Sequence, residues 1–284
     1  MRQINGNQLI LNTTNEKVYR EVIGLIPAAG EAKRIAPLPC SKELYPVGFE
    51  IEKKSNLQRP KSACEYLIEE MKYVGVSKIY LILRKGKWDI PSYLGDGSRF
   101  GMHFAYVIMG LPFGVPYTLD QAYPFIKEKT VVFGFPDILF ECKNAFQALI
   151  GKIESCNYEI VLGLFPSDRP EKADLVGFDK KGKVRKIVMK KKHTRLRYTW
   201  GIAAWTPVFT KYLHEKLRDC KATTFIEREL FISDIINFAV TDGLRVEAVH
   251  VSKKPFIDIG TPEDLARAAR CFMHLSNRES IFDS

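Results

Sequence analysis

The chain has 284 residues, of which 46% are hydrophobic and 12% aromatic, so it can bury a large core and is not a disordered protein. Its net charge of +10 equals the ten lysines and arginines of residues 180–197, a segment without acidic residues, so the basicity is local. No apolar run approaches the roughly 18 residues that cross a bilayer, there is no signal-peptide core, and the six cysteines form no CxxC pair; we expect a cytoplasmic protein without a membrane segment or zinc.

Short apolar, β-branched segments alternate with helical patterns along the chain, which predicts an α/β protein with a mixed, mostly parallel sheet flanked by helices. The expected strands are residues 22–26, 78–83, 103–108, 130–135, 158–164, 198–205 and 244–251. Between the first two, Cys64, Leu67, Ile68 and Met71 recur at helical spacing, and Gly75 is placed to end that helix.

Two further elements are expected in the second half. Residues 175–189 have the pattern of an antiparallel hairpin, which we expect to project as a small lobe. Thr261 is placed to cap a C-terminal helix. No repeat, low-complexity tract or linker divides the chain, so we predict an N-terminal extension over residues 1–20 and a single domain over residues 21–284.

The stretch LIPAAGEAKRIAPLPCSKELYPV, residues 25–47, leads from the first strand into an irregular loop. Gly30 lets the backbone come close to a ligand, while Arg34 offers a bidentate fork and Lys42 a point charge. In open α/β sheets the loop after the first strand is a usual place for phosphate. The loop suits a polyphosphate, although an ordinary solvated connection between strand and helix also explains these residues.

The motifs PAAGEAKRIAP and SKELYPV resemble the signature of sugar-1-phosphate nucleotidylyltransferases, the glucose-1-phosphate thymidylyl- and uridylyltransferase family. The likeness continues in order through LGDGS, FGFPDILF, a hairpin, ELFISDIINFA and PFIDIGTPEDL, and spans about residues 22–270. It implies a Rossmann-like nucleotidyltransferase fold. It also implies nucleotidyl transfer from a nucleoside triphosphate to a sugar 1-phosphate, which gives an NDP-sugar and pyrophosphate.

The resemblance further implies roles for single residues, carried over at matching positions. They are catalytic roles for Arg34, Lys42 and Lys192; nucleotide contacts from Ala29, Gly30, Met109 and Gly114; substrate contacts from Lys191, Lys192 and Gly201; and Mg²⁺ ligands in Asp137 and Asp258. Mg²⁺ needs few protein ligands because phosphates and water complete its octahedron. Strand-end aspartates also cap turns, isolated glycines also mark bulges, and hairpin lysines are often only exposed charges.

Four departures from the family pattern bear on the chemistry. Ala32 and Lys33 replace a Gly-Thr pair in the phosphate loop, Met109 replaces a base-reading glutamine, and the segment before Asp137 is two residues longer. Lys190 and Lys191 replace glutamates beside the sugar. Because cations in place of hydrogen-bond acceptors favour a negatively charged ligand, we expect an acidic or additionally phosphorylated sugar as acceptor.

Other functions use the same residues. A cytidylyltransferase with a non-sugar acceptor shares the loop, a glycosyltransferase shares the fold and a metal aspartate, and a regulator would only bind the nucleotide. UTP, dTTP and CTP all remain candidate donors. The basic segment 180–197 has few aromatic residues for base stacking, only Tyr198 and Trp200 at its end, so nucleic acid is not an expected partner. Relatives in the family are often dimers or tetramers, so a homo-oligomer is an expectation.

Overall fold

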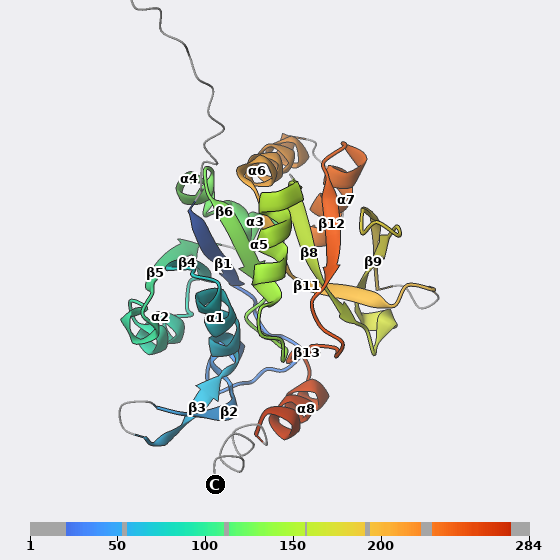
Figure 1. Ribbon diagram of the computed structural model, residues 1–284. Coiled ribbons are helices and arrows are strands. Elements are labelled where there is room, and N and C mark those ends of the chain that lie inside the picture. The colour runs from blue at the N-terminus through green and yellow to red at the C-terminus, as the bar shows by residue number, and fades with distance from the viewer. Residues whose placement is uncertain are drawn as a thin grey trace, which may run out of the picture.

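The structure is a computed structural model that describes residues 21–52, 56–110, 114–156, 158–190, 194–222 and 229–273 (Figure 1). The predicted N-terminal extension over residues 1–20 lies outside these residues, as do Lys191 and Lys192. Within the described ranges, no helix is long and apolar enough to span a bilayer.

A nine-stranded sheet forms the centre of the described part of the chain. Its strands are β1 (Val22–Ala28), β4 (Lys78–Arg84), β5 (His103–Met109), β6 (Thr130–Gly134), β8 (Ile160–Pro166), β9 (Asp174–Phe178), β10 (Val184–Met189), β11 (Tyr198–Trp205) and β12 (Val246–His250). The order is β10-β9-β11-β6-β1-β4-β5, with β8 paired to β11 and β12 paired to β8. All seven predicted strands are therefore present.

The sheet is mixed, as predicted. Parallel pairs join β1 to β4 and β6, β4 to β5, and β8 to β12. Antiparallel pairs surround β11, which contacts β6, β8 and β9. The predicted hairpin is formed by β9 and β10, and it continues the main sheet at one edge because Leu175 pairs with Thr199 of β11.

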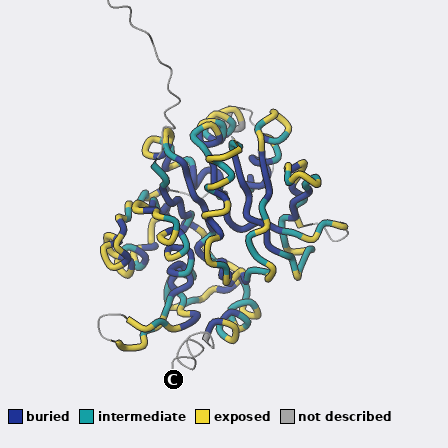
Figure 2. Tube along the Cα trace, viewed as in Figure 1, coloured by how far each residue is buried: buried dark blue, intermediate teal, exposed yellow. Residues whose placement is uncertain are grey.

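Helices cover both faces of the main sheet, as Figure 1 shows. One face carries α1 (Ala63–Tyr73), α2 (Asp89–Leu94) and α5 (Ala145–Cys156), and the other carries α3 (Val115–Asp120), α4 (Tyr123–Ile126), α6 (Pro207–Ala222) and α7 (Ile232–Thr241). Alternation in β1 sends Ile23 and Leu25 to one face and Ile26 and Ala28 to the other. The central strands β1, β6, β8 and β11 are accordingly the most continuously buried part of the molecule (Figure 2).

A third, smaller core lies below the sheet, around α8 (Pro262–Met273). It is completed by two short antiparallel sheets, β2 (Pro46–Ile51) with β3 (Gln58–Ser62), and β7 (Ile138–Leu139) with β13 (Ile257–Asp258). The predicted cap of α8 is confirmed, because the Asp264 amide donates to Thr261 Oγ1 at 3.2 Å. Three 3₁₀ turns complete the described elements: η1 (Lys42–Leu44), η2 (Ser98–Phe100) and η3 (Pro170–Lys172).

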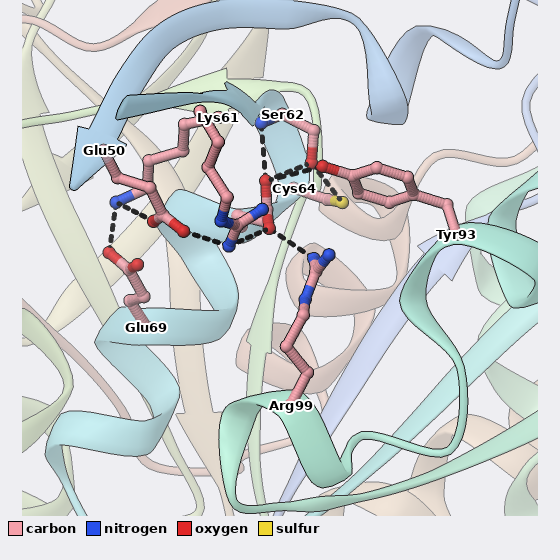
Figure 3. A network of polar contacts seen from close by, with 9 residues as sticks. Glu50, Lys61, Ser62, Cys64, Glu69, Tyr93 and Arg99 are labelled. Carbon is pink, nitrogen blue, oxygen red and sulfur yellow. Dashed lines mark hydrogen bonds and ion pairs between the residues drawn. The ribbon is translucent and has the colours of Figure 1, made fainter. Parts of the chain in front are cut away.

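A network of charged side chains, the brace cluster, joins α1 to the β2–β3 ribbon and to the α2–η2 segment (Figure 3). At its centre is Glu65, whose side chain has no exposed surface. Its carboxylate accepts hydrogen bonds from the Ser62 amide at 2.6 Å and hydroxyl at 2.9 Å, from Arg99 Nη2 at 2.5 Å and from Tyr93 Oη at 3.3 Å. Arg59 Nη2 lies 3.4 Å away. All four residues that contact this buried carboxylate therefore present hydrogen-bond donors to it.

Candidate active site

A cavity of about 600 Å³ opens beside the ends of β1 and β6. These strands are parallel neighbours, with Leu25 paired to Phe133, so the segments that follow them leave the sheet at the same edge. The cavity is lined by the loop after β1, the segment after β6, the loop between β8 and β9, and the β13–α8 junction. Six residues predicted from the sequence lie on its wall: Ala29, Gly30, Arg34, Lys42, Asp137 and Asp258.

Lys42 and Asp137 form an ion pair at this wall, although 95 positions separate them in the chain. Their side chains are only 16% and 14% exposed, so water screens the pair weakly. Burial opposes the charge on Lys42, but the Asp137 carboxylate outweighs it and raises the pKa of the lysine. Burial likewise opposes the charge on Asp137, and Lys42 overcomes it, so the pKa of that carboxyl is lowered. Both groups are therefore charged at neutral pH.

Asp258 lies beside Asp137 because β13 pairs with β7. Asp258 is opposite Ile138, and the amide of Ile259 donates to the Asp137 carbonyl at 3.0 Å. Although the segment before Asp137 is two residues longer than in the family pattern, Asp137 thus still lies next to Asp258. Asp258 is exposed to the cavity, but desolvation by the surrounding protein, together with the neighbouring Asp137 carboxylate, raises its pKa to about 6, while Lys42 and Arg34 act in the opposite direction. The two carboxylates repel each other across a space that faces the cavity.

Arg34 completes the arrangement from the loop after β1. A Cβ on Gly260 would lie 2.7 Å from Arg34 Nη2 and 3.0 Å from Asp258 Oδ1, so this glycine leaves room for the guanidinium to lie beside the carboxylate. We name Arg34, Lys42, Asp137 and Asp258 the cavity cluster. Two cations and two carboxylates here converge on one volume.

The loop that carries these cations has a specific backbone. Ala32 has φ of +54°, a left-handed conformation that favours glycine, and its carbonyl accepts from the amides of Ile35 and Ala36 at 3.0 Å each. A Cβ on Gly30 would meet nothing within 4 Å, so the space above this glycine is open to a ligand. The family pattern has a glycine at the position of Ala32. In this chain an alanine, which has less backbone freedom, is held there in a strained conformation.

Residues distant in sequence hold the loop in place, and the sequence did not predict them. The Ser41 amide and hydroxyl donate to the Asp89 carboxylate at 2.6 and 2.8 Å. Lys87 Nζ donates to both oxygens of Glu43 at 2.6 and 2.7 Å, and both side chains are buried. Asp89 and Lys87 belong to the segment that begins α2, whose sequence carries no signal for this contact.

Several predicted site residues do not line the cavity. Met109 is buried in the core, and Gly114 is buried with φ of +90° against the backbone of Leu230. A Cβ on Gly201 would lie 2.6 Å from Ile138 Cδ1, so this glycine makes room for a side chain of the cavity wall and does not itself border the cavity. The predicted roles of Lys191 and Lys192 fall outside the described residues.

Other lining residues were missed in the sequence. Arg169 Nη1 contacts Asp264 Oδ1 at 2.6 Å, and Arg267 Nη1 contacts Asp168 Oδ2 at 2.6 Å, so two crossed ion pairs tie the β8–β9 loop to α8. Asp174, at the start of β9, also lines the cavity. Isolated charges in loops have no distinctive spacing, and only the fold brings these together.

Known proteins resemble this chain over most of its length. The family model described as nucleotidyl transferase matches residues 23–273. The low-salt glycan biosynthesis nucleotidyltransferase Agl11 of Haloferax volcanii is 25% identical over 268 residues, which cover 92% of this chain and 69% of that protein. A glucose-1-phosphate thymidylyltransferase of Neisseria gonorrhoeae is 24% identical over 268 residues, which cover 91% of this chain and 85% of that protein.

A solved structure extends the likeness to three dimensions. A crystal structure from Bacillus anthracis, described as a glucose-1-phosphate thymidylyltransferase in complex with a sucrose, matches with a TM-score of 0.74 at 23% identity. The match covers 88% of this chain and 94% of that one. It confirms the predicted fold.

Proposed function

Because the chain belongs to the nucleotidyl transferase family, we propose that it transfers a nucleotidyl group from a nucleoside triphosphate to a sugar 1-phosphate. The observation that carries this proposal is the cavity cluster, which joins a phosphate-loop arginine and lysine to two carboxylates on the wall of one cavity. The names of the relatives support the same reaction class. A cytoplasmic location and a homo-oligomeric state are further parts of the proposal.

The reaction needs charge stabilisation more than acid–base chemistry. A phosphate oxygen of the sugar 1-phosphate attacks the α-phosphorus of the triphosphate, the bond from this phosphorus to the bridging oxygen breaks, and pyrophosphate leaves with that bond's electron pair. The attacking oxygen is already deprotonated, so no general base is required. Arg34 is suited to the departing pyrophosphate and Lys42 to the α-phosphate, because each supplies a cation where negative charge accumulates.

Asp137 and Asp258 fit a Mg²⁺ ion by the chemistry of their donors. They are two adjacent carboxylates facing a cavity, and their mutual repulsion would be relieved by a divalent cation between them. Within the described residues no group of three or more acidic, histidine or cysteine side chains has metal-binding geometry. A Mg²⁺ ion held by these two carboxylates would take its other ligands from phosphates and water. When bound, Mg²⁺ would neutralise phosphate charge during transfer.

The donor base and the sugar are open parts of the proposal. UTP, dTTP and CTP are the candidate donors, and the thymidylyltransferase relatives give dTTP the most direct support. An acidic acceptor is supported by Lys190, which borders the cavity, and by Lys191 and Lys192 next to it in sequence. Phosphate contact by Lys192 and nucleotide contacts by Met109 and Gly114 stay predictions.

The test is release of pyrophosphate in the presence of Mg²⁺. Each of ATP, CTP, GTP, UTP and dTTP would be combined with neutral, acidic and doubly phosphorylated sugar 1-phosphates, and Asp137→Ala and Asp258→Ala would serve as controls. We expect release with a restricted pair of substrates and its loss in both variants. Release only with phosphocholine or another non-sugar acceptor would favour a cytidylyltransferase. Nucleotide binding without release under any condition would contradict the proposal and favour a regulator or glycosyltransferase.

A further inference from the structure

Most of the basic segment over residues 180–197 has no role in the proposed transfer. Its positive charge equals the net charge of the whole chain. The carboxylate at the turn of the β9–β10 hairpin, Asp179, already pairs with Arg185 at 2.6 Å. The described cations of the segment are all exposed: Lys180, Lys181, Lys183, Arg185, Lys186, Lys190, Arg195 and Arg197. The segment therefore presents more positive charge than its own carboxylates can neutralise.

The end of this segment lies at the rim of the cavity. The amide of Ser167, a residue that lines the cavity, donates to the Arg197 carbonyl at 2.8 Å. Arg195 precedes Arg197 by two residues, and both side chains are exposed. Lys190 also lines the cavity, but there Asp174 is its electrostatic partner. The two arginines therefore carry the free positive charge beside the β8–β9 loop.

A third cation of the segment lies close to the two arginines. A Cβ on Gly177 of β9 would lie 3.3 Å from Lys186 Cγ and 3.7 Å from Leu196 Cδ2, so residues 195–197 run past Lys186 on the hairpin. We name Lys186, Arg195 and Arg197 the rim cations. Among the residues that the structure describes, no carboxylate pairs with any of the three within 4 Å.

The rim cations give the surroundings of the cavity an asymmetric charge. Three cations of the cavity wall have carboxylate partners: Lys42 with Asp137, Arg169 with Asp264 and Arg267 with Asp168. Exposed charges without such partners act through solvent over about one Debye length, which is about 8 Å at physiological ionic strength. The field at the cavity mouth is therefore positive on the side of the β9–β10 hairpin, which forms one edge of the main sheet (Figure 1).

From this geometry we propose that the rim cations steer the anionic substrates into the cavity and raise their association rates. A nucleoside triphosphate and a sugar 1-phosphate each carry more than one negative charge, so both are attracted before they touch the protein. Charges at the rim of a binding site change mainly the association rate and its dependence on salt. The inference rests on the proposed function, which supplies these substrates.

Stopped-flow fluorescence tests the inference by measuring association and dissociation rates of N-methylanthraniloyl derivatives of UTP, CTP and dTTP. Arg195→Gln combined with Arg197→Gln removes two rim charges and keeps polar side chains. We expect the association rate to fall about threefold at physiological ionic strength and further at lower salt, while the dissociation rate changes less than about 1.5-fold. The difference should vanish near 1 M salt, where the Debye length is about 3 Å.

Two further variants make the test specific. Arg195→Lys combined with Arg197→Lys keeps both charges and should bind as fast as wild type. Lys180→Gln combined with Lys181→Gln is the matched control, because it removes two charges of the same segment beyond the far end of β9, a strand that spans about 13 Å. At physiological ionic strength this control should change the association rate less than about 1.5-fold.

The outcomes separate the inference from the proposed function. An unchanged association rate in the double glutamine variant of the arginines at equal Tm, an equal loss in the Lys180 and Lys181 control, or an equal loss in the lysine variant would each overturn the inference. Failure of all three derivatives to bind wild type would overturn it as well. Absence of pyrophosphate release from wild type would instead overturn the proposed function, and the association rates, which need no turnover, would still decide the inference.

Discussion

The cavity cluster and the brace cluster both consist of carboxylates and cationic side chains, but they differ in how the carboxylates are paired. In the brace cluster the central carboxylate of Glu65 is surrounded by donors from four residues. In the cavity cluster, Asp258 accepts no side-chain hydrogen bond from the described residues and stands beside a second carboxylate. The protein itself supplies the partners of the carboxylate in the brace cluster, whereas Asp258 in the cavity cluster would gain partners only from a ligand.

The contrast shows how a fold separates stability from function. Buried charges that are fully paired hold elements in register, whereas like charges kept together cost folding free energy and persist where a ligand compensates. The brace cluster ties α1 to its neighbours away from the cavity, and the cavity cluster faces solvent through the cavity. Substitutions in the cavity cluster should therefore reduce activity without reducing stability, and substitutions in the brace cluster should reduce stability without reducing activity.

The largest expected effect is on activity, in the cavity cluster. Asp258→Asn removes one of the two repelling carboxylates, and we expect pyrophosphate release to fall about 100-fold or more. The same change should raise the free energy of unfolding in EDTA, because the repulsion from Asp137 disappears; we expect about 1 kcal/mol, a value already reduced because Asp258 is exposed and solvent screens its charge. Turnover assays and thermal melts measure the two quantities.

Glu128→Gln serves as the control for Asp258→Asn, since it removes an equal charge from an exposed residue away from the cavity. A variant of Asp258 that loses stability in EDTA together with activity would show that this carboxylate supports the fold, and the contrast between the clusters would be lost.

The opposite signature is expected in the brace cluster. Glu65→Gln keeps an amide oxygen for the Ser62 amide, so the helix cap survives, but it leaves Arg99 without its buried counter-charge and Arg59 with Glu50 alone. We expect the free energy of unfolding to fall by about 2 to 3 kcal/mol, measured by urea denaturation. kcat/KM should change less than about twofold, because the cluster does not touch the cavity.

Glu69→Gln is the matched control for this change, because it removes the same charge one turn further along α1. Glu69 is exposed and pairs with Lys61, so its loss should cost less than about 0.5 kcal/mol. If both variants lowered the free energy of unfolding equally, the loss would come from the net charge of α1 and not from the burial of Glu65.

The sequence predicted one of these clusters and not the other, for physical reasons. The strands of the main sheet are apolar runs with clear boundaries, and Arg34 and Lys42 lie in a motif whose order along the chain is recognisable. The pairing of Asp137 with Asp258 depends on β7 and β13, two-residue strands with no pattern of their own. Only the resemblance to the family brought these two positions together.

Residues whose role depends on register could not be found in the same way. Glu65 follows a serine by three positions, which indicates a helix cap, yet nothing in the sequence shows that two arginines approach it from separate elements. Asp174 is an ordinary polar residue before a strand until β9 pairs with β11 beside Ser233. Long-range pairing is a property of the folded sheet, and a single sequence carries little of it.

The smallest expected effect concerns a carboxylate of α1 that the brace cluster leaves out. Glu70 Oε2 is buried and has no hydrogen-bond partner within the described residues. Burial, reinforced by the adjacent Glu69, raises the pKa of Glu70 from 4.5 to about 7. The folded protein therefore binds this proton more tightly than the unfolded chain does.

This difference has a definite sign. Between pH 4.5 and 7 Glu70 holds more proton in the folded state than in the unfolded state, so its contribution to the free energy of unfolding falls as pH rises and stays low above pH 7. Glu70→Gln removes the titrating group and should therefore stabilise the protein by about 1 kcal/mol at pH 8, a value reduced by partial exposure, with little change near pH 4.5. Urea denaturation of both proteins at several pH values measures this. Parallel pH curves would show that Glu70 finds a partner in solution, and that α1 has no uncompensated charge.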